Sequence, residues 1–244
     1  MDLKGVKITW LGHSTFVLQT PAGKKVLVDP WLEGNPKCPA AHHETASDAI
    51  LCTHGHNDHI GDAVSAFGRC SGPLVGIFEL VTWLSSKKGL AGDRMVGMNH
   101  GGSTKLGDVG VTVTMTDARH SSTFVEADGT FVPLGNPAGY VIGFEGGLKV
   151  YHAGDTCLFG DMALIKELWA PDVAILPIGD HFTMCPRQAA YAAEMLGVKA
   201  VLPCHYGTFG LLTGTPAALK EELGKRGLGG KVEVITLEPG GTVG

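Results

Sequence analysis

The feature that most constrains this chain is a dense group of metal-binding side-chain types in residues 51–61. Four of them fall within six positions: His54, His56, Asp58 and His59. The preceding residues 48–51 are typical of a short buried strand, and residues 61–67 are typical of a helix. The group would therefore lie in a strand-to-helix loop, where open α/β sheets place their binding sites. Imidazole and carboxylate ligands suit zinc, with iron, manganese or nickel as alternatives. We expect two ions, because one ion would strain the backbone to collect all four side chains.

The rest of the chain repeats a pattern in which a predicted strand is followed by His or Asp. Periodicity predicts strands at 6–10, 15–19, 25–28, 73–75, 109–115, 140–144, 148–152, 173–177, 200–203 and 232–237, and helices at 78–86, 159–169, 186–196 and from 216 onward. Residues 31–47 show no regular period and predict a loop. The side chains that follow predicted strands are His13, Asp29, His120, Asp155, His181 and His205. Their recurrence at strand ends predicts one composite site.

Composition narrows the class of protein. The 244 residues are 44% hydrophobic and 18% charged, which is enough apolar material for a sizeable core, and no linker-like segment divides them. We therefore predict a single domain spanning residues 1–244. The net charge of −5 argues against nucleic acid and membrane surfaces as partners, and no segment resembles a membrane span or a signal peptide. A cytoplasmic protein is expected, and its six cysteines form no CxxC pair and are interpreted as buried thiols.

Several side chains beside the predicted ligands keep two interpretations. His13 either lines the cleft or is a hydrogen-bonded structural residue, and Asp29 is expected to brace a ligand histidine rather than bind metal. His181 is a candidate general acid, because imidazole titrates near neutral pH, or a histidine bonded only to nearby backbone. Thr156 and Thr183 are candidate substrate contacts, although a threonine at a strand end is often only a cap.

The ordered set of potential ligands resembles the metallo-β-lactamase superfamily. The pattern is His54-x-His56-x-Asp58-His59, followed by His120, Asp155 and His205. Within that superfamily the chain is similar to uncharacterised metal-dependent hydrolases related to bacterial ascorbate-phosphate lactonase. The supporting strings are WLGHST at 10–15, AGDT at 153–156, LPIG at 176–179 and HYGTF at 205–209. The resemblance covers essentially the whole chain and implies a four-layer αββα sandwich of two similar halves, with the site at one edge of the sheets.

The resemblance also implies roles for the individual ligands. His54, His56 and His120 would hold the first ion, while Asp58, His59 and His205 would hold the second. Asp155 would bridge the two ions. Such a centre generates a bridging hydroxide at neutral pH, so Asp155 and Asp58 would serve catalysis as well as binding.

The charge of such a centre indicates its substrate. Two divalent ions carry +4, and Asp58, Asp155 and a hydroxide supply about −3, which leaves the site near +1. A small anionic or carbonyl substrate is expected, such as a phosphodiester, a lactone or a related ester. The oligomeric state stays open, a homo-oligomer included.

Two other classes of function compete with hydrolysis. A di-iron oxidoreductase on the same fold typically carries Glu at the position of His56 and has a flavin-binding module, and this chain shows neither feature. A non-catalytic metal-binding protein would predict a blocked cleft or missing ligands, whereas every expected ligand type is present. The sequence therefore favours a metal-dependent hydrolase.

Overall fold

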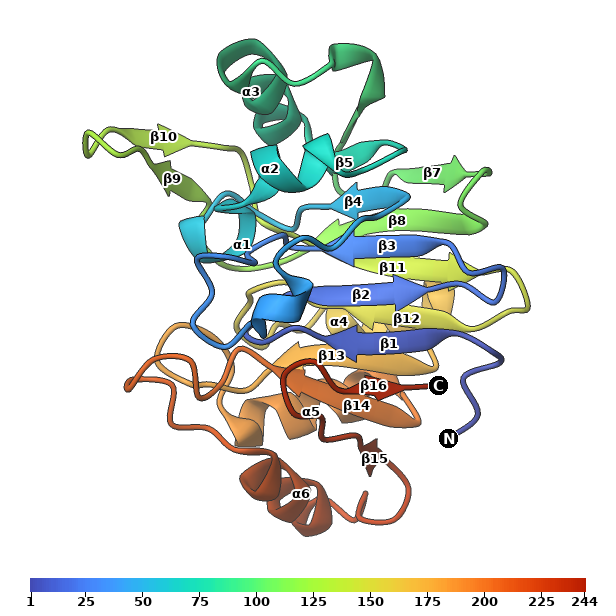
Figure 1. Ribbon diagram of the computed structural model, residues 1–244. Helices are drawn as coiled ribbons and strands as arrows, with labels where there is room; N and C mark the ends of the chain where they lie inside the picture. Colours follow the sequence, from blue (N-terminus) through green and yellow to red (C-terminus); the bar gives the residue numbers. More distant parts are fainter.

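Two mixed β-sheets pack face to face in the computed structural model, which describes all residues from 1 to 244 (Figure 1). The first sheet starts as an antiparallel meander of β1, β2 and β3 and continues with three strands parallel to β3. Its seven strands, in spatial order, are β16 (Thr242–Val243), β1 (Lys7–Trp10), β2 (Phe16–Gln19), β3 (Lys25–Val28), β4 (Ala49–Leu51), β5 (Leu74–Ile77) and β6 (Met95–Met98).

The second sheet repeats this arrangement. Strands β7, β8, β11 and β12 pair antiparallel with one another in that order, and three further strands run parallel to β12. The predicted construction from two similar halves is therefore confirmed. The seven strands, in spatial order, are β15 (Glu233–Val234), β14 (Ala200–Cys204), β13 (Val173–Pro177), β12 (Lys149–His152), β11 (Ala138–Phe144), β8 (Val111–Asp117) and β7 (Ser103–Leu106).

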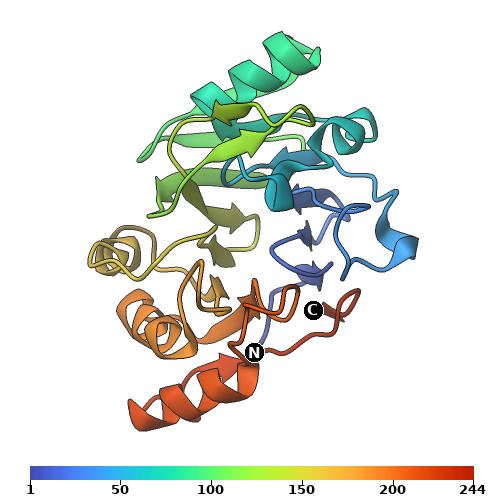
Figure 2. The same cartoon turned by 90° about the vertical axis from the view of Figure 1, so that its left-hand side faces the viewer.

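Helices cover the outer sides of the two sheets and complete the predicted αββα sandwich (Figure 2). Helices α4, α5 and α6 cover the outer face of the second sheet with one continuous apolar cluster, and α3 packs on β5 and β6 of the first. The helices are α1 (Asn57–Ile60), α2 (Ala63–Gly68), α3 (Phe78–Lys88), α4 (Met162–Trp169), α5 (Pro186–Leu196) and α6 (Pro216–Lys225), with 3₁₀ turns η1 (Ala40–His42) and η2 (Gly92–Arg94).

The alternation of side chains along β13 explains why its sequence is apolar throughout. Val173 and Ile175 belong to the core between the two sheets, whereas Ala174 and Leu176 belong to the core under the helices. A strand covered on both faces needs apolar residues at every position. The same division holds for β11, β12 and β14, so the second sheet contributes to both cores.

Two hydrogen bonds join the sheets directly beside residues 52–59. The Tyr140 hydroxyl on β11 donates to the carbonyl of Cys52 at 2.7 Å, and the backbone N–H of Ala138 donates to the carbonyl of Thr53 at 2.9 Å. Tyr140 is completely buried, as is Cys52. These bonds fix the end of β4 against the second sheet.

Three parts of the fold differ from the sequence prediction. The single helix expected at 61–67 is two helices, and α1 begins inside the supposed loop, so Asp58 and His59 are helical. A two-stranded hairpin of β9 (Thr123–Val125) and β10 (Phe131–Pro133) was not predicted. The last predicted strand is reduced to β15, because the chain leaves the second sheet there and returns to pair with β1 through β16.

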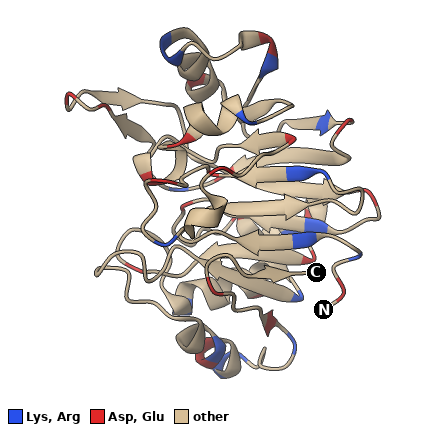
Figure 3. Ribbon diagram, in the orientation of Figure 1, with Lys and Arg blue, Asp and Glu red and all other residues tan.

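None of the helices is both long and apolar enough to span a lipid bilayer. Lys and Arg are scattered along the chain, on α3, the strand ends and α6, in the view of Figure 3.

We predict that Tyr140→Phe lowers the free energy of unfolding by about 1–3 kcal/mol, because the buried Cys52 carbonyl loses its hydroxyl donor. Urea denaturation measures this change. The matched control is Tyr151→Phe, since the Tyr151 hydroxyl is buried without a hydrogen-bond partner and its removal should cost little. Equal losses in the two variants would contradict the proposed link between the sheets.

Candidate functional site

The seven predicted ligands converge at one edge of the sandwich, the edge that faces the viewer in Figure 2. They follow the carboxyl ends of β4, β8, β12 and β14, which come from both sheets. Predicted neighbours His13 and Asp29 follow β1 and β3 at the same edge. Together these nine side chains form what we call the His–Asp cluster: His13, Asp29, His54, His56, Asp58, His59, His120, Asp155 and His205.

Backbone strain is concentrated at this edge. His13, Asp29 and His205 have φ angles of 53°, 49° and 53°, in the left-handed region that side-chain-bearing residues rarely occupy. Each such residue costs of order 1–3 kcal/mol and persists where the surrounding structure holds it. At Gly179 a Cβ would lie 2.0 Å from the His205 carbonyl oxygen, so only glycine permits the close approach of the two strand ends.

Helix α1 directs two adjacent ligand-type residues to different places. His56 is the N-cap, and its carbonyl accepts from the N–H groups of His59 and Ile60, both at 3.0 Å. Successive residues on a helix point about 100° apart. Asp58 accordingly reaches His13, while His59 reaches Asp29 and Asp155.

Asp29 organises the buried base of the cluster. Its Oδ1 accepts from the N–H of Thr53 at 2.7 Å, and its Oδ2 accepts from the Thr53 hydroxyl and from His59 Nδ1, also at 2.7 Å. The Thr53 hydroxyl then accepts from His54 Nδ1 at 2.9 Å. The Nε2 atoms of both imidazoles therefore lie away from Asp29, beside His56 and Asp155 respectively.

Asp155 lies between the remaining groups. Its Oδ2 is 2.9 Å from His205 Nε2, 3.3 Å from His59 Nε2 and 3.7 Å from His120 Nε2. The carboxylate is almost completely buried. One oxygen therefore lies close to three imidazoles that come from three different segments of the chain.

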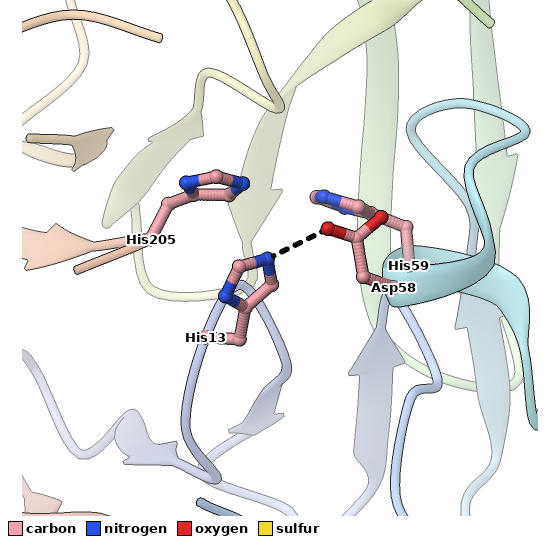
Figure 4. A group of neighbouring side chains, drawn as sticks. All are labelled: His13, Asp58, His59 and His205. Atoms are coloured by element: carbon pink, nitrogen blue, oxygen red, sulfur yellow. Dashed lines mark hydrogen bonds and ion pairs between the residues drawn. The ribbon is translucent and has the colours of Figure 1, made fainter. Parts of the chain in front are cut away.

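The ligand atoms fall into three overlapping groups, one of which, Asp29, His54 and His59, joins the other two at the buried base. Nitrogens of His54, His56 and His120 lie within 4.8 Å of one another, and His54 Nε2 is 3.0 Å from His56 Nδ1. The second group holds His13, Asp58, His59 and His205, again within 4.8 Å (Figure 4).

His13 belongs to the site rather than to a remote structural position. Its Nε2 is 3.1 Å from Asp58 Oδ2, its Nδ1 is 3.0 Å from the Thr208 hydroxyl, and its ring lies 4.0 Å from that of His205. The N–H of His205 donates to the His13 carbonyl at 3.0 Å, which joins the two sheets. His13 is thus completely buried, hydrogen-bonded, and next to the second group of ligand-type side chains.

Burial lowers the pKa of three histidines of the cluster. Burial, with the nearby His205 imidazole, lowers the pKa of His13 to about 4, and burial with His120 lowers that of His56 to about 4. Burial also lowers the pKa of His54 well below its ordinary value. These three imidazoles are therefore neutral at pH 7 and offer lone pairs.

The pKa values of His59 and Asp155 are instead shifted in the direction that favours the charged form of each. Burial opposes charge on His59, yet Asp155 and Asp29 raise its pKa well above the ordinary value. Burial alone would raise the pKa of Asp155, but His205 and His59 hold it well below its ordinary value. Asp155 is thus ionised, and a cation is favoured beside it.

The predicted general acid and the two predicted substrate contacts differ in exposure and in hydrogen bonding. His181 is exposed, with a φ of 54°, and its ring packs at 4.5 Å against Phe182 without a hydrogen bond to the cluster. The Thr183 hydroxyl is buried and unpartnered. The Thr156 hydroxyl accepts from the N–H of Arg119 at 2.9 Å and donates to the Cys157 carbonyl at 2.7 Å, so it ties the segment before His120 to the segment after Asp155.

Sequence reasoning missed three residues that hold ligand-type side chains. Thr53 links Asp29 to His54, Thr208 contacts His13, and the Ser121 hydroxyl is 3.1 Å from His56 Nε2. Each is adjacent to a predicted ligand or lies in a quoted motif string. That adjacency was the only available signal, because a hydroxyl has no distinctive spacing.

The chain is similar in sequence and in fold to known proteins. A family model described as "Beta-lactamase superfamily domain" matches residues 24–206. A "UPF0173 metal-dependent hydrolase" of Roseiflexus sp. (strain RS-1) is 47% identical over 240 residues, which cover 97% of this chain and 96% of that protein. Another protein so named, from Koribacter versatilis, is 50% identical over 222 residues, covering 91% and 93%. Among solved structures, Igni18, a metallo hydrolase from Ignicoccus hospitalis, has a TM-score of 0.83 and 38% identity, covering 98% and 97%.

We predict that the metal-free protein loses stability as the pH falls from about 6.5 towards 4. In this interval the unfolded chain protonates imidazoles that the folded chain keeps neutral, namely His13, His54 and His56. The raised pKa of His59 stabilises the folded chain on acidification, the opposite effect. This gain in stability is already present once the pH is below about 6.5, the pKa of histidine in the unfolded chain. Denaturant titrations in a chelator at several pH values measure the slope. Replacement His56→Gln should flatten it, and stability that rises on acidification would contradict the assignment.

Proposed function

The chain belongs to the metal-dependent hydrolases of the metallo-β-lactamase superfamily, and on this premise we propose that it cleaves a phosphodiester, lactone or related ester at a centre of two metal ions. The observation that carries the proposal is the proximity of Asp155 to His120 of one ligand group and to His59 and His205 of the other. The catalytic unit is a single domain spanning residues 1–244.

Unpaired buried atoms in the cluster fit bound cations. His59 Nε2 and Asp155 Oδ1 are buried without a hydrogen-bond partner, and so is His205 Nδ1. Buried polar atoms nearly always have partners, and leaving them unpaired is costly. The close pair His54 Nε2 and His56 Nδ1 likewise brings together two nitrogens that a shared cation would satisfy.

In this proposal the two ions are divided between two ligand groups. His54, His56 and His120 would hold one ion, Asp58, His59 and His205 the other, and Asp155 would contact both. His13 stands close enough to the second group to be either a further ligand or the partner that orients Asp58. Nitrogen and oxygen donors favour zinc, and manganese, nickel or iron are compatible with the same set.

Two divalent ions bound here would lower the pKa of a water molecule and stabilise negative charge that develops on the substrate. The chain contributes position and charge. Asp155 is held by three imidazoles and orients the nucleophile between the two groups, and Asp58 is fixed by His13. Asp58 and Asp155 offset only part of the charge of two cations, so the site attracts a small anionic or carbonyl-containing substrate.

Hydrolysis is better supported than the two alternatives considered from the sequence. The relatives are named as metal-dependent hydrolases, which favours neither an oxidoreductase nor a non-catalytic protein. The ligand-type side chains face a common centre, which a non-catalytic remnant has no need to preserve. We place the reaction in the cytoplasm, with a small molecule as the substrate and neither nucleic acid nor a membrane as a partner.

We predict that the wild-type protein retains about two transition-metal ions per chain and that Asp155→Asn loses them, with turnover reduced at least ~100-fold. The substitution keeps the volume of the side chain and removes the charge that three imidazoles face. Elemental analysis measures the metal, and hydrolysis screens on phosphodiesters, lactones and thioesters measure turnover. The control is Asp93→Asn at an exposed site in η2. Full metal content and activity in Asp155→Asn would refute the bridging role.

A second prediction concerns His181 as the proton donor to the leaving group. His181→Ala should leave the metal content intact and slow turnover by about 100-fold, and the loss should be larger for alkoxide than for nitrophenolate leaving groups. Kinetics on matched esters of the two kinds measure the difference. His42→Ala, in η1, is the control. If the rate loss does not depend on the leaving group, His181 has no role as an acid.

A further inference from the structure

The β9–β10 hairpin stands apart from both sheets, directly after His120. Its register pairs Phe131 with Val125, Val132 with Phe124 and Pro133 with Thr123. In Figure 1 it projects beyond the sheet edge that carries the His–Asp cluster, near α1. A hairpin that extends past the sheets needs packing of its own to remain ordered.

One face of the hairpin provides that packing. Side chains alternate along a strand, so Phe124 and Val132 share one face. Both pack against the main core, and the Phe124 ring lies 5.0 Å from that of Trp83 on α3. Lys88 on α3 contacts Glu126 with bonds of 2.6 and 2.8 Å. This face is therefore a structural one.

Asn57 fastens the hairpin to the cluster. Its side-chain amide donates to the Val125 carbonyl at 2.8 Å, and its Oδ1 accepts from the Val125 N–H at 2.9 Å. The pair of bonds imitates the pairing of a neighbouring strand. Because Asn57 immediately precedes Asp58, the hairpin is held at a fixed position relative to the predicted ligands.

The opposite face of the hairpin carries two exposed apolar side chains, Val125 and Phe131, together with Thr123, and Phe131 is 72% exposed. These three residues line a pocket of about 460 Å³ together with the polar residues His56, Asn57, Asp58 and Ser121, so the apolar surface of the pocket comes from Val125 and Phe131 alone. The pocket is within the size range of small-molecule sites, and no lysine or arginine lines it.

We propose that this pocket binds an apolar substituent of the substrate next to the bond that is cleaved, and that Phe131 and Val125 determine the preference for it. The inference rests on the proposed function, since it takes the cluster as the reacting centre. The substrate class is thereby narrowed to an ester, lactone or phosphodiester that carries an alkyl or aryl group. A polyanionic substituent would meet no cationic side chain in this pocket.

Alkylphosphonates test the pocket without requiring turnover, because their anionic head is a ligand for the metal centre and their tail can be lengthened. Calorimetry on the zinc-loaded protein should show the Kd tightening by about two- to four-fold per methylene from methyl- to hexylphosphonate until the pocket is filled. Phe131→Ala should reduce the hexyl-to-methyl affinity ratio at least tenfold, and Phe131→Leu should recover most of it. The control is Phe78→Ala, because Phe78 is 59% exposed on α3 and lines a different pocket.

The outcomes separate this inference from the proposed function. Methylphosphonate binding without any gain from longer tails, or an equal gain in wild type and Phe131→Ala, would overturn the apolar subsite alone. Failure of every phosphonate to bind the zinc-loaded protein would overturn the subsite together with the metal centre. Loss of the gain in Phe78→Ala as well would also overturn it, since the effect would then not be specific to this pocket.

Discussion

The structure depends on one electrostatic arrangement, in which His59 is buried between the carboxylates of Asp29 and Asp155. Ionisable groups without water are costly to bury unless each is paired. Here Asp29 is satisfied by Thr53 and His59, while Asp155 relies on imidazoles that leave its Oδ1 unpaired. Both oxygens of Asp29 at the base have hydrogen-bond partners, whereas Oδ1 of Asp155 at the centre has none. That asymmetry is what makes a cation the natural occupant.

The two-sheet sandwich is the means by which these groups are brought together. Parallel strands end at the same edge of a sheet, so two similar sheets facing each other present two sets of loops to one cleft. Bonds that cross between the sheets, from Tyr140 to Cys52 and from His205 to His13, hold the two sets at a fixed distance. The left-handed backbone at His13, Asp29 and His205 turns the chain sharply there, at an energetic cost that the surrounding core tolerates.

The environment of the cluster is polar on one side and apolar on another. The base contains Thr53 and Asp29, whereas the hairpin after His120 adds an exposed Phe131 beside His56 and Asp58. A reacting centre that attracts anions next to an apolar wall suits a substrate with a charged or carbonyl head and a hydrophobic group. In the proposed reaction, metal binding and substrate preference are assigned to neighbouring but separate parts of the fold.

The sequence by itself determined the fold class, most strands and the identity of the potential ligands. Those features depend on local signals: periodicity along β8 or β13, and the dense spacing of His54, His56, Asp58 and His59. Only the tertiary structure decided that α1 begins at Asn57, that His13 joins the second ligand group, and that the β9–β10 hairpin forms a wall of the site. The hairpin strands are three residues each and are stabilised by Trp83 and Asn57 rather than by their own pattern. Contacts between residues that are distant in the chain leave no periodic trace in either segment, so they became visible only once both sheets were in place.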